Sequence, residues 1–177
     1  MTSDQKIVFV GAASGILGML ALVTFFTFHI LPSPTIADEM GSRLAYALMA
    51  NVFAMIPLFL MFVTIGNERF LSEAIDPLRH AENRTMEINA RVSQNTLEQN
   101  LFFFIGTLSL STLVPLQYLQ VVWACAIVFV IGRFLFWAGY HKNPLYRAPG
   151  LSSVAYMNLG IIIYVLYKIV SFAILAG

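Results

Sequence analysis

Residues 91–106 read RVSQNTLEQNLFFFIG, a stretch in which polar groups give way to an apolar run. Arg91, Asn95 and Glu98 are spaced so that, on an α-helix, they share one face. Glu98 then lies about two turns, or roughly 10 Å, beyond Arg91. An ionisable side chain within an apolar run is costly to place in a membrane and by default faces a partner or a ligand. The stretch therefore predicts the point at which a helix enters the membrane.

The composition of the chain is that of a polytopic membrane protein. It has 177 residues, of which 59% are hydrophobic and 11% charged, whereas soluble domains carry about 25% charged residues. A net charge of +1 gives no reason to expect a nucleic acid partner. The single cysteine, Cys125, lies in an apolar run, so we expect a small buried hydrophobic residue and no internal disulfide.

Apolar runs of membrane-spanning length recur along the whole chain and predict an all-α integral membrane fold with five spans. A cleaved signal peptide is the competing interpretation of the first run, but that run is longer than a typical signal-peptide core, so we expect a retained helix. Pro57 is expected to kink the second span. The predicted spans cover residues 7–30, 44–65, 84–113, 116–139 and 154–175.

The lysines and arginines are distributed unequally between the two sides of such a membrane protein. Five spans place alternate loops on alternate sides, and the side with more Lys and Arg is usually cytoplasmic. The N-terminus is therefore expected inside the cell. The cytoplasmic set is Lys6, Arg69, Arg79, Arg84, Arg91, Lys142 and Arg147, and the opposite set is Arg43 and Lys168.

Polar residues of several predicted spans converge at the cytoplasmic end. Arg133, Phe136 and Tyr140 share one face of the fourth span. Because the loop before that span is short, the third and fourth spans are expected to be antiparallel neighbours, which predicts a Glu98–Arg133 ion pair. Such a pair has two interpretations: it fixes helix packing, or it belongs to a ligand site.

An excess of arginine over acidic residues favours the ligand site. Arg69, Arg91, Arg133 and Arg147 outnumber the nearby Glu68 and Glu98. Fixed guanidinium groups suit an anionic ligand that carries carboxylates or a thiolate. The alternative is that these arginines meet anionic lipid headgroups.

The order and spacing of these motifs resemble the MAPEG family, the membrane-associated proteins in eicosanoid and glutathione metabolism. The resemblance rests on Arg91-x-x-x-Asn95-x-x-Glu98, on residues 133–140 (RFLFWAGY) and on residues 144–149 (PLYRAP). It covers residues 44–175 and implies a four-helix bundle that forms a homotrimer, with glutathione bound between protomers at the cytoplasmic face. Residues 44–177 are then expected to form the MAPEG-like four-helix domain. Residues 1–43 form an extra N-terminal transmembrane helix and its linker, as in the five-span, mattrin-like branch.

The resemblance also implies roles for individual residues. Arg147 would stabilise the glutathione thiolate as the catalytic arginine, and Arg69 would act as a proton donor or charge clamp. A guanidinium next to a thiol favours the ionised, nucleophilic form. The implied glutathione-binding residues are Arg91, Asn95, Glu98, Arg133 and Tyr140.

Two functions of different class follow from these observations. The first is a membrane-bound glutathione transferase or peroxidase that acts on lipophilic electrophiles or hydroperoxides. The second is a non-catalytic lipid-binding or regulatory membrane protein on the same trimeric scaffold. Phe136, which stands where related enzymes carry a tyrosine or a histidine, and the extra first span favour the second. A transporter is a weaker third hypothesis, because the chain shows no inverted repeat.

The sequence does not distinguish between two membranes. A bacterial inner membrane and an endoplasmic reticulum both fit it.

Overall fold

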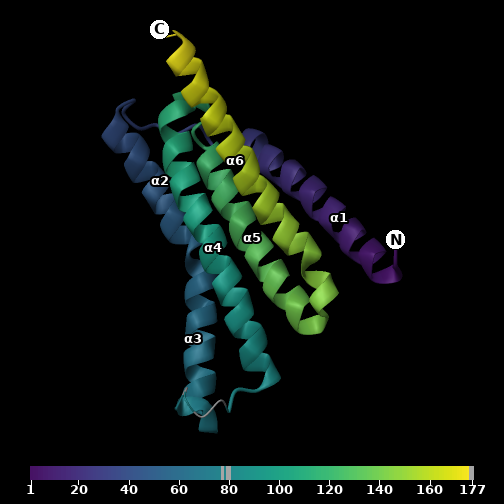
Figure 1. The fold of residues 1–177 in the computed structure, drawn as a ribbon. Coiled ribbons are helices and arrows are strands. Elements are labelled where there is room, and N and C mark those ends of the chain that lie inside the picture. Colours follow the sequence, from purple (N-terminus) through teal and green to yellow (C-terminus); the bar gives the residue numbers. More distant parts are fainter. Residues whose placement is uncertain (77, 79–80, 176–177) are drawn as a thin grey trace.

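The computed structural model describes residues 1–76, 78 and 81–175, and within these residues the regular structure is helical, without a strand (Figure 1). Short 3₁₀ turns precede α4, α5 and α6, and a π-helical turn over Phe26–Ile30 ends α1. The long helices are α1 (Ser3–Phe25), α2 (Met40–Ala54), α3 (Ile56–Phe70), α4 (Arg84–Leu113), α5 (Val121–Lys142) and α6 (Ala148–Leu175). The expected all-α membrane fold is confirmed.

Among the described residues, four helical segments are long and apolar enough to cross a membrane, namely Ser3–Ile30, Met40–Phe70, Leu116–Lys142 and Pro144–Leu175. The expected third span is present as the 30-residue helix α4, about 45 Å long. This helix lies among the other helices in Figure 1, but its composition is too polar for it to count as a membrane span by hydropathy. Some of its polar residues, such as Thr96 and Thr107, are buried against the neighbouring helices, whereas others, such as Arg91 and Glu98, are exposed.

The last span begins earlier than its sequence predicts. Pro149 and Gly150 were expected to belong to a loop, yet α6 starts at Ala148. A proline in the first turn of a helix costs no hydrogen bond, because the N–H groups there have no partner within the helix. Gly150 allows the backbones of α6 and α5 to come into contact, since a Cβ at this position would lie 2.3 Å from the amide nitrogen of Phe136.

Pro57 divides the second span into α2 and α3. The helices are separated at Met55, whose amide still donates to the carbonyl oxygen of Asn51 at 3.0 Å. Pro57 then occupies the first turn of α3, where its missing N–H is tolerated. The expected kink is confirmed.

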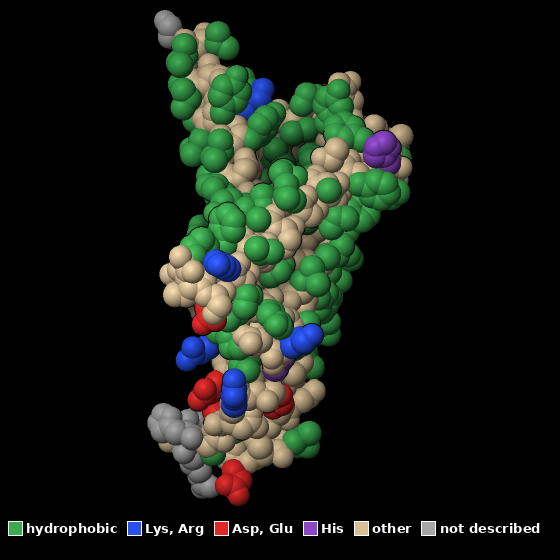
Figure 2. Space-filling view, turned by 90° about the vertical axis from the view of Figure 1, so that its right-hand side faces the viewer, with side chains coloured by type: hydrophobic (Ala, Val, Ile, Leu, Met, Phe, Trp, Pro, Cys, Tyr) green, Lys and Arg blue, Asp and Glu red, His purple; other side chains and the backbone are tan. Residues whose placement is uncertain are grey.

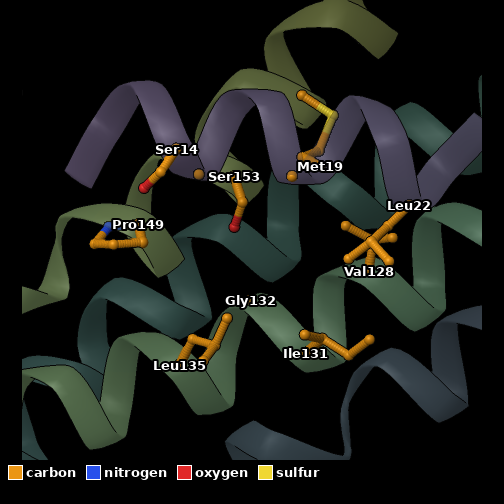
Figure 3. Close-up of a pocket in the computed structure, with 11 residues that line it drawn as sticks. Ser14, Met19, Leu22, Val128, Ile131, Gly132, Leu135, Pro149 and Ser153 are labelled. Carbon is orange, nitrogen blue, oxygen red and sulfur yellow. The ribbon is translucent and has the colours of Figure 1, made fainter. Parts of the chain in front are cut away.

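The first helix lies on the outside of the bundle and packs mainly against α6 (Figure 1). The contact depends on glycine. A Cβ at Gly15 would lie 2.2 Å from the carbonyl oxygen of Pro149, and the Ser152 hydroxyl donates to the carbonyl oxygen of Ala12 at 3.0 Å. Gly11 and Gly15 form the small-xxx-small spacing that brings membrane helices into close contact. Figure 3 shows a small pocket beside this contact, with α1 on one side and α5 on the other. Its volume is about 110 Å³.

We predict that Gly15→Leu forces α1 away from α6, because the added side chain has no space. Gly18→Leu is the matched control, since a Cβ at Gly18 meets nothing within 4 Å. Spin labels on the exposed positions Leu17 and Tyr156, in a Cys125→Ala background, report the distance between the helices. Gly15→Leu should lengthen this distance by about 2 Å or more, against normal interaxial distances of about 8–10 Å. Equal distances in the two variants would contradict the proposed contact.

Candidate functional site

A line of small polar side chains along the inner face of α4 is buried in the bundle. These residues are Asn89, Ser93, Thr96, Asn100, Thr107 and Ser111. Their spacing of mostly three or four residues places them on one face of the helix. We call this set the polar seam of α4.

The polar seam and its flanks connect α4 to its neighbours by side-chain hydrogen bonds. On α2, the Asn51 amide donates to the Thr107 hydroxyl at 2.8 Å. On α6, the Asn158 amide donates to the side-chain oxygen of Gln99 at 3.0 Å. Buried polar groups must be paired, so these bonds fix the register between α4 and the two helices.

The charged side chains gather at one end of the molecule, as Figure 2 shows over the face in view. This end, which we call the polar end, contains the C-terminal ends of α3 and α5 and the N-terminal ends of α4 and α6. Tyr140 and Arg147 lie at these helix ends or on the turn before α6, whereas Glu98 lies in the middle of α4. Of the residues that the sequence singled out, contacts join Arg133 to Asn95 and Arg147 to Tyr140.

Arg133 on α5 is fully buried. Its Nη1 donates to the side-chain oxygen of Asn95 on α4 at 3.0 Å, and its Nη2 donates to the carbonyl oxygen of Gly150 on α6 at 3.1 Å. Its Nε has no hydrogen-bond partner among the described residues. One guanidinium therefore joins three helices.

The expected Glu98–Arg133 ion pair is wrong. Glu98 is exposed on the outside of α4 and accepts a hydrogen bond from Gln94 at 3.1 Å. The ion pairs among the described residues are Arg43–Asp38 and Arg69–Glu82. Glu98 and Asn95 are three residues apart on α4, about 60° short of a full turn, and Asn95 is the residue that points at α5.

Arg133 and Arg147 lie at the two ends of an edge-to-face aromatic pair, Phe136 and Tyr140. The Arg133 guanidinium carbon lies 4.7 Å from the ring centre of Phe136, and the Phe136 and Tyr140 rings meet edge to face with centroids 5.8 Å apart. The Arg147 guanidinium carbon lies 5.1 Å from the ring centre of Tyr140. These contacts are favourable cation–π and aromatic interactions. Phe136 is buried, whereas Tyr140 and Arg147 are half-buried, so only the outer half of the column is accessible.

The other predicted site residues are not part of this column. Arg91 is exposed and lies on the same outer side of α4 as Glu98. Arg69, at the end of α3, forms its ion pair with Glu82. Arg79, counted among the cytoplasmic cations, lies outside the described residues.

A second polar cluster at this end was not predicted from the sequence. Asn89 of the polar seam, which is 1% exposed, donates to a Glu68 carboxylate oxygen at 3.1 Å. Its side-chain oxygen lies 2.8 Å from the Trp137 Nε1 and 2.7 Å from the His141 Nε2. Trp137 and His141 are four residues apart on α5 and therefore share one face of the helix. This spacing, at the end of a predicted span, was the sequence signal from which the cluster could have been predicted.

The fold and the polar end define a class, that of multi-pass integral membrane proteins built as a helical bundle around a polar central helix. The match to the model of the MAPEG family, over residues 44–167, shows that the chain belongs to that family. The resemblance inferred from the sequence is confirmed.

Two curated relatives are similar to this chain. Transmembrane protein 79 of mouse is 25% identical over 128 residues, which cover 72% of this chain and 32% of the mouse protein. Transmembrane protein 79 of cattle is 26% identical over 111 residues, or 63% of this chain and 28% of the bovine protein. The aligned part is thus about a third of the length of these relatives. No solved structure matches the chain.

We predict that Asn95→Ala destabilises the bundle, because it leaves a buried Arg133 nitrogen without its partner on α4. Such an unpaired group costs about 1–3 kcal/mol. Leu97→Ala, a change at an exposed position on the same helix, is the matched control and should alter stability by less than about 0.5 kcal/mol. Unfolding in detergent, followed by circular dichroism, measures both. Similar stability of the two variants would show that the Arg133–Asn95 bond does not hold the helices.

Proposed function

We propose that the protein is a membrane-bound, glutathione-dependent transferase or peroxidase that acts on lipophilic electrophiles or hydroperoxides. The observation that carries the proposal is the accessible guanidinium of Arg147, held on the Tyr140 ring at the polar end of a MAPEG-family bundle. The excess of Lys and Arg at this end supports a cytoplasmic location for it, with the N-terminus inside.

The side chains at this end suit glutathione, a peptide with two carboxylates, an ammonium group and amides. Arg91 and Arg147 supply cations for the carboxylates or the thiolate, and Glu98 supplies an anion for the ammonium group. Arg91 and Glu98 are exposed, and Arg147 is half-buried. Asn95 is half-buried, and its amide nitrogen is not used in its bond to Arg133, so it remains available as a donor. Arg133 and Phe136 are sealed in the bundle and would position this site without touching the ligand.

The outer face of α4 supports a homotrimer, the assembly implied by the family resemblance. Arg91, Gln94, Glu98, Leu101 and Ile105 are exposed on this face, and they alternate at three- and four-residue intervals. This spacing is the seam of a left-handed helix–helix contact. A carboxylate such as that of Glu98 is costly next to lipid tails, which favours burial of the face against a second copy and completion of the glutathione site between copies.

Arg147 is proposed to act as the catalytic residue by stabilising the negative charge on the glutathione sulfur as the thiol proton is lost to water. Glutathione supplies the nucleophile: its sulfur forms a bond to an electrophilic carbon, and the group displaced from that carbon leaves with the electron pair and takes up a proton. With a hydroperoxide, two glutathione molecules yield an alcohol, glutathione disulfide and water. Arg69 would contribute its charge from the edge of the site.

We predict that Glu98→Ala abolishes saturable glutathione binding, whereas Arg147→Ala keeps binding within a few-fold and loses turnover. Loss of a charge-assisted contact predicts a decrease in affinity of about tenfold or more. Isothermal calorimetry on detergent-purified protein measures binding, and conjugation of a lipophilic electrophile measures turnover. Glu87→Ala, on the exposed first turn of the same helix, is the control. Normal binding by Glu98→Ala would refute the site, and normal turnover by Arg147→Ala would refute the catalytic role.

The assembly has its own test. Leu101→Trp, in the middle of the exposed α4 face, should dissociate the trimer, because the larger side chain blocks close helix contact. Leu166→Trp, at an exposed position on α6, should leave the trimer intact. Native mass spectrometry gives the number of chains directly. A monomeric wild-type protein would refute the proposed assembly.

The alternative function is a non-catalytic lipid-binding or regulatory membrane protein on the same scaffold. The burial of Phe136 favours it, because the position where related enzymes present a tyrosine or histidine is closed here by the contact with Arg133. A folded trimer that binds no glutathione in the calorimetry would establish this alternative.

A further inference from the structure

The Asn89 cluster lines a hollow of about 380 Å³ between the ends of α3, α4 and α5. Its walls are Thr64, Glu68, Thr85, Asn89, Phe134, Trp137, Ala138 and His141. None of these residues belongs to the proposed glutathione site. The hollow therefore needs an explanation of its own.

The hydrogen bonds fix which atoms the cluster presents to a ligand. An indole N–H can only donate, so the Asn89 atom facing Trp137 is the oxygen. His141 Nε2 faces the same oxygen at 2.7 Å and must carry a hydrogen. In the neutral ring, Nδ1 of His141 is then an acceptor. Among the described residues, the Glu68 oxygen Oε1 accepts no hydrogen bond, since Asn89 binds Oε2.

The hollow thus combines hydrogen-bond acceptors with an aromatic surface. Glu68 offers a carboxylate oxygen, and His141 offers a ring nitrogen. The Phe134 and Trp137 rings stack with centroids 6.5 Å apart and planes inclined by 21°. A cation is attracted both by a carboxylate and by the face of an indole ring. A primary ammonium group, with three N–H donors, satisfies this combination, whereas a quaternary ammonium group has no N–H to donate.

The hollow lies where the surface changes from apolar to polar. On α3, Phe62 and Val63 are exposed just before the half-buried Glu68. On α5, Phe134 and Leu135 are exposed, and they precede the exposed His141. Tryptophan is also enriched at this level of membrane proteins. A ligand here meets headgroups on one side and acyl chains on the other.

The hollow faces away from the proposed contact between copies. Asn89 and Glu98 are nine residues apart on α4, or two and a half turns, so they point in opposite directions. The Asn89 side of α4 faces α3 and α5, and the hollow reaches the surface at the exposed residues Phe134, Ala138 and His141, so a trimer formed through the Glu98 face leaves it uncovered. The neighbouring cations do not fill the hollow: Arg69 pairs with Glu82, and the Lys142 Nζ lies 5.8 Å from the ring centre of Tyr146.

We propose that this hollow binds the headgroup of a phospholipid that carries a primary amine. The ammonium group is placed between the free Glu68 oxygen and His141 Nδ1, against the ring of Trp137, and the acyl chains follow the exposed apolar faces of α3 and α5. The site is independent of the glutathione site and of any catalytic activity.

Native mass spectrometry of the purified full-length chain tests the proposal, with phosphatidylethanolamine and phosphatidylcholine of identical acyl chains as probes. The wild-type protein should bind phosphatidylethanolamine about tenfold more tightly, a difference of about 1.4 kcal/mol. Glu68→Gln should remove this preference while preserving the fold, because its side-chain oxygen still accepts from Asn89. Glu87→Gln, exposed on α4 and outside the hollow, should retain it.

A second variant guards against misfolding of the first. His141→Phe removes the ring nitrogen at an exposed position and should reduce the preference about threefold or more. Equal binding of the two lipids by the wild-type protein, or an intact preference in both variants, would overturn the proposal. Glycerophosphoethanolamine, which has no acyl chains, should compete weakly. Binding as tight as that of the lipid would rule out a membrane lipid as the occupant.

Discussion

The hydrogen bonds between the polar seam of α4 and its neighbours are the interactions on which the other helices depend. Burial of apolar surface gives little preference for one helix arrangement inside a membrane, because lipid tails are as apolar as leucine. Close packing and interhelical hydrogen bonds must therefore decide which helices meet and at what height. Each neighbour meets α4 or its flanks through a polar contact: Thr107 on the α2 side, Asn89 on the α3 and α5 sides, and Gln99 on the α6 side. Polar residues that make α4 a poor membrane span by composition are what make it the centre of the bundle.

The sequence predicted the order and approximate position of the apolar segments, because length and hydropathy report directly on membrane crossing. The break at Pro57 was predictable for a similar reason, since a missing N–H is a local property. The early start of α6 was not, because Pro149 and Gly150 act as helix breakers or as first-turn residues depending on what packs against them. The spacing of Gly11 and Gly15 indicated that the first helix makes a close helix–helix contact, but it did not identify α6 as the partner.

The candidate site shows the same division between local and tertiary information. Helical spacing correctly grouped Arg133, Phe136 and Tyr140 on one face, and these residues do meet. It also placed Asn95 and Glu98 on one face of α4, but an error of about 60° in direction decides whether a side chain points at α5 or at the outside. Charge made Glu98 the obvious partner for Arg133, whereas the structure pairs the buried guanidinium with the neutral oxygens of Asn95 and Gly150. Neutral partners of this kind have no signature in a single sequence.

The first helix is held differently from all the others. Among the described residues no hydrogen bond joins it to α4; it rests on α6 through the backbone contact at Gly15 and the Ser152 hydroxyl. Close contact between backbones holds this helix, with few hydrogen bonds beside it: Ser152 binds the carbonyl oxygen of Ala12, and the Gln120 amide binds that of Thr27. The position of α1 is therefore set by the absence of side chains at its glycines, so that the smallest residues of the chain decide where a whole helix lies.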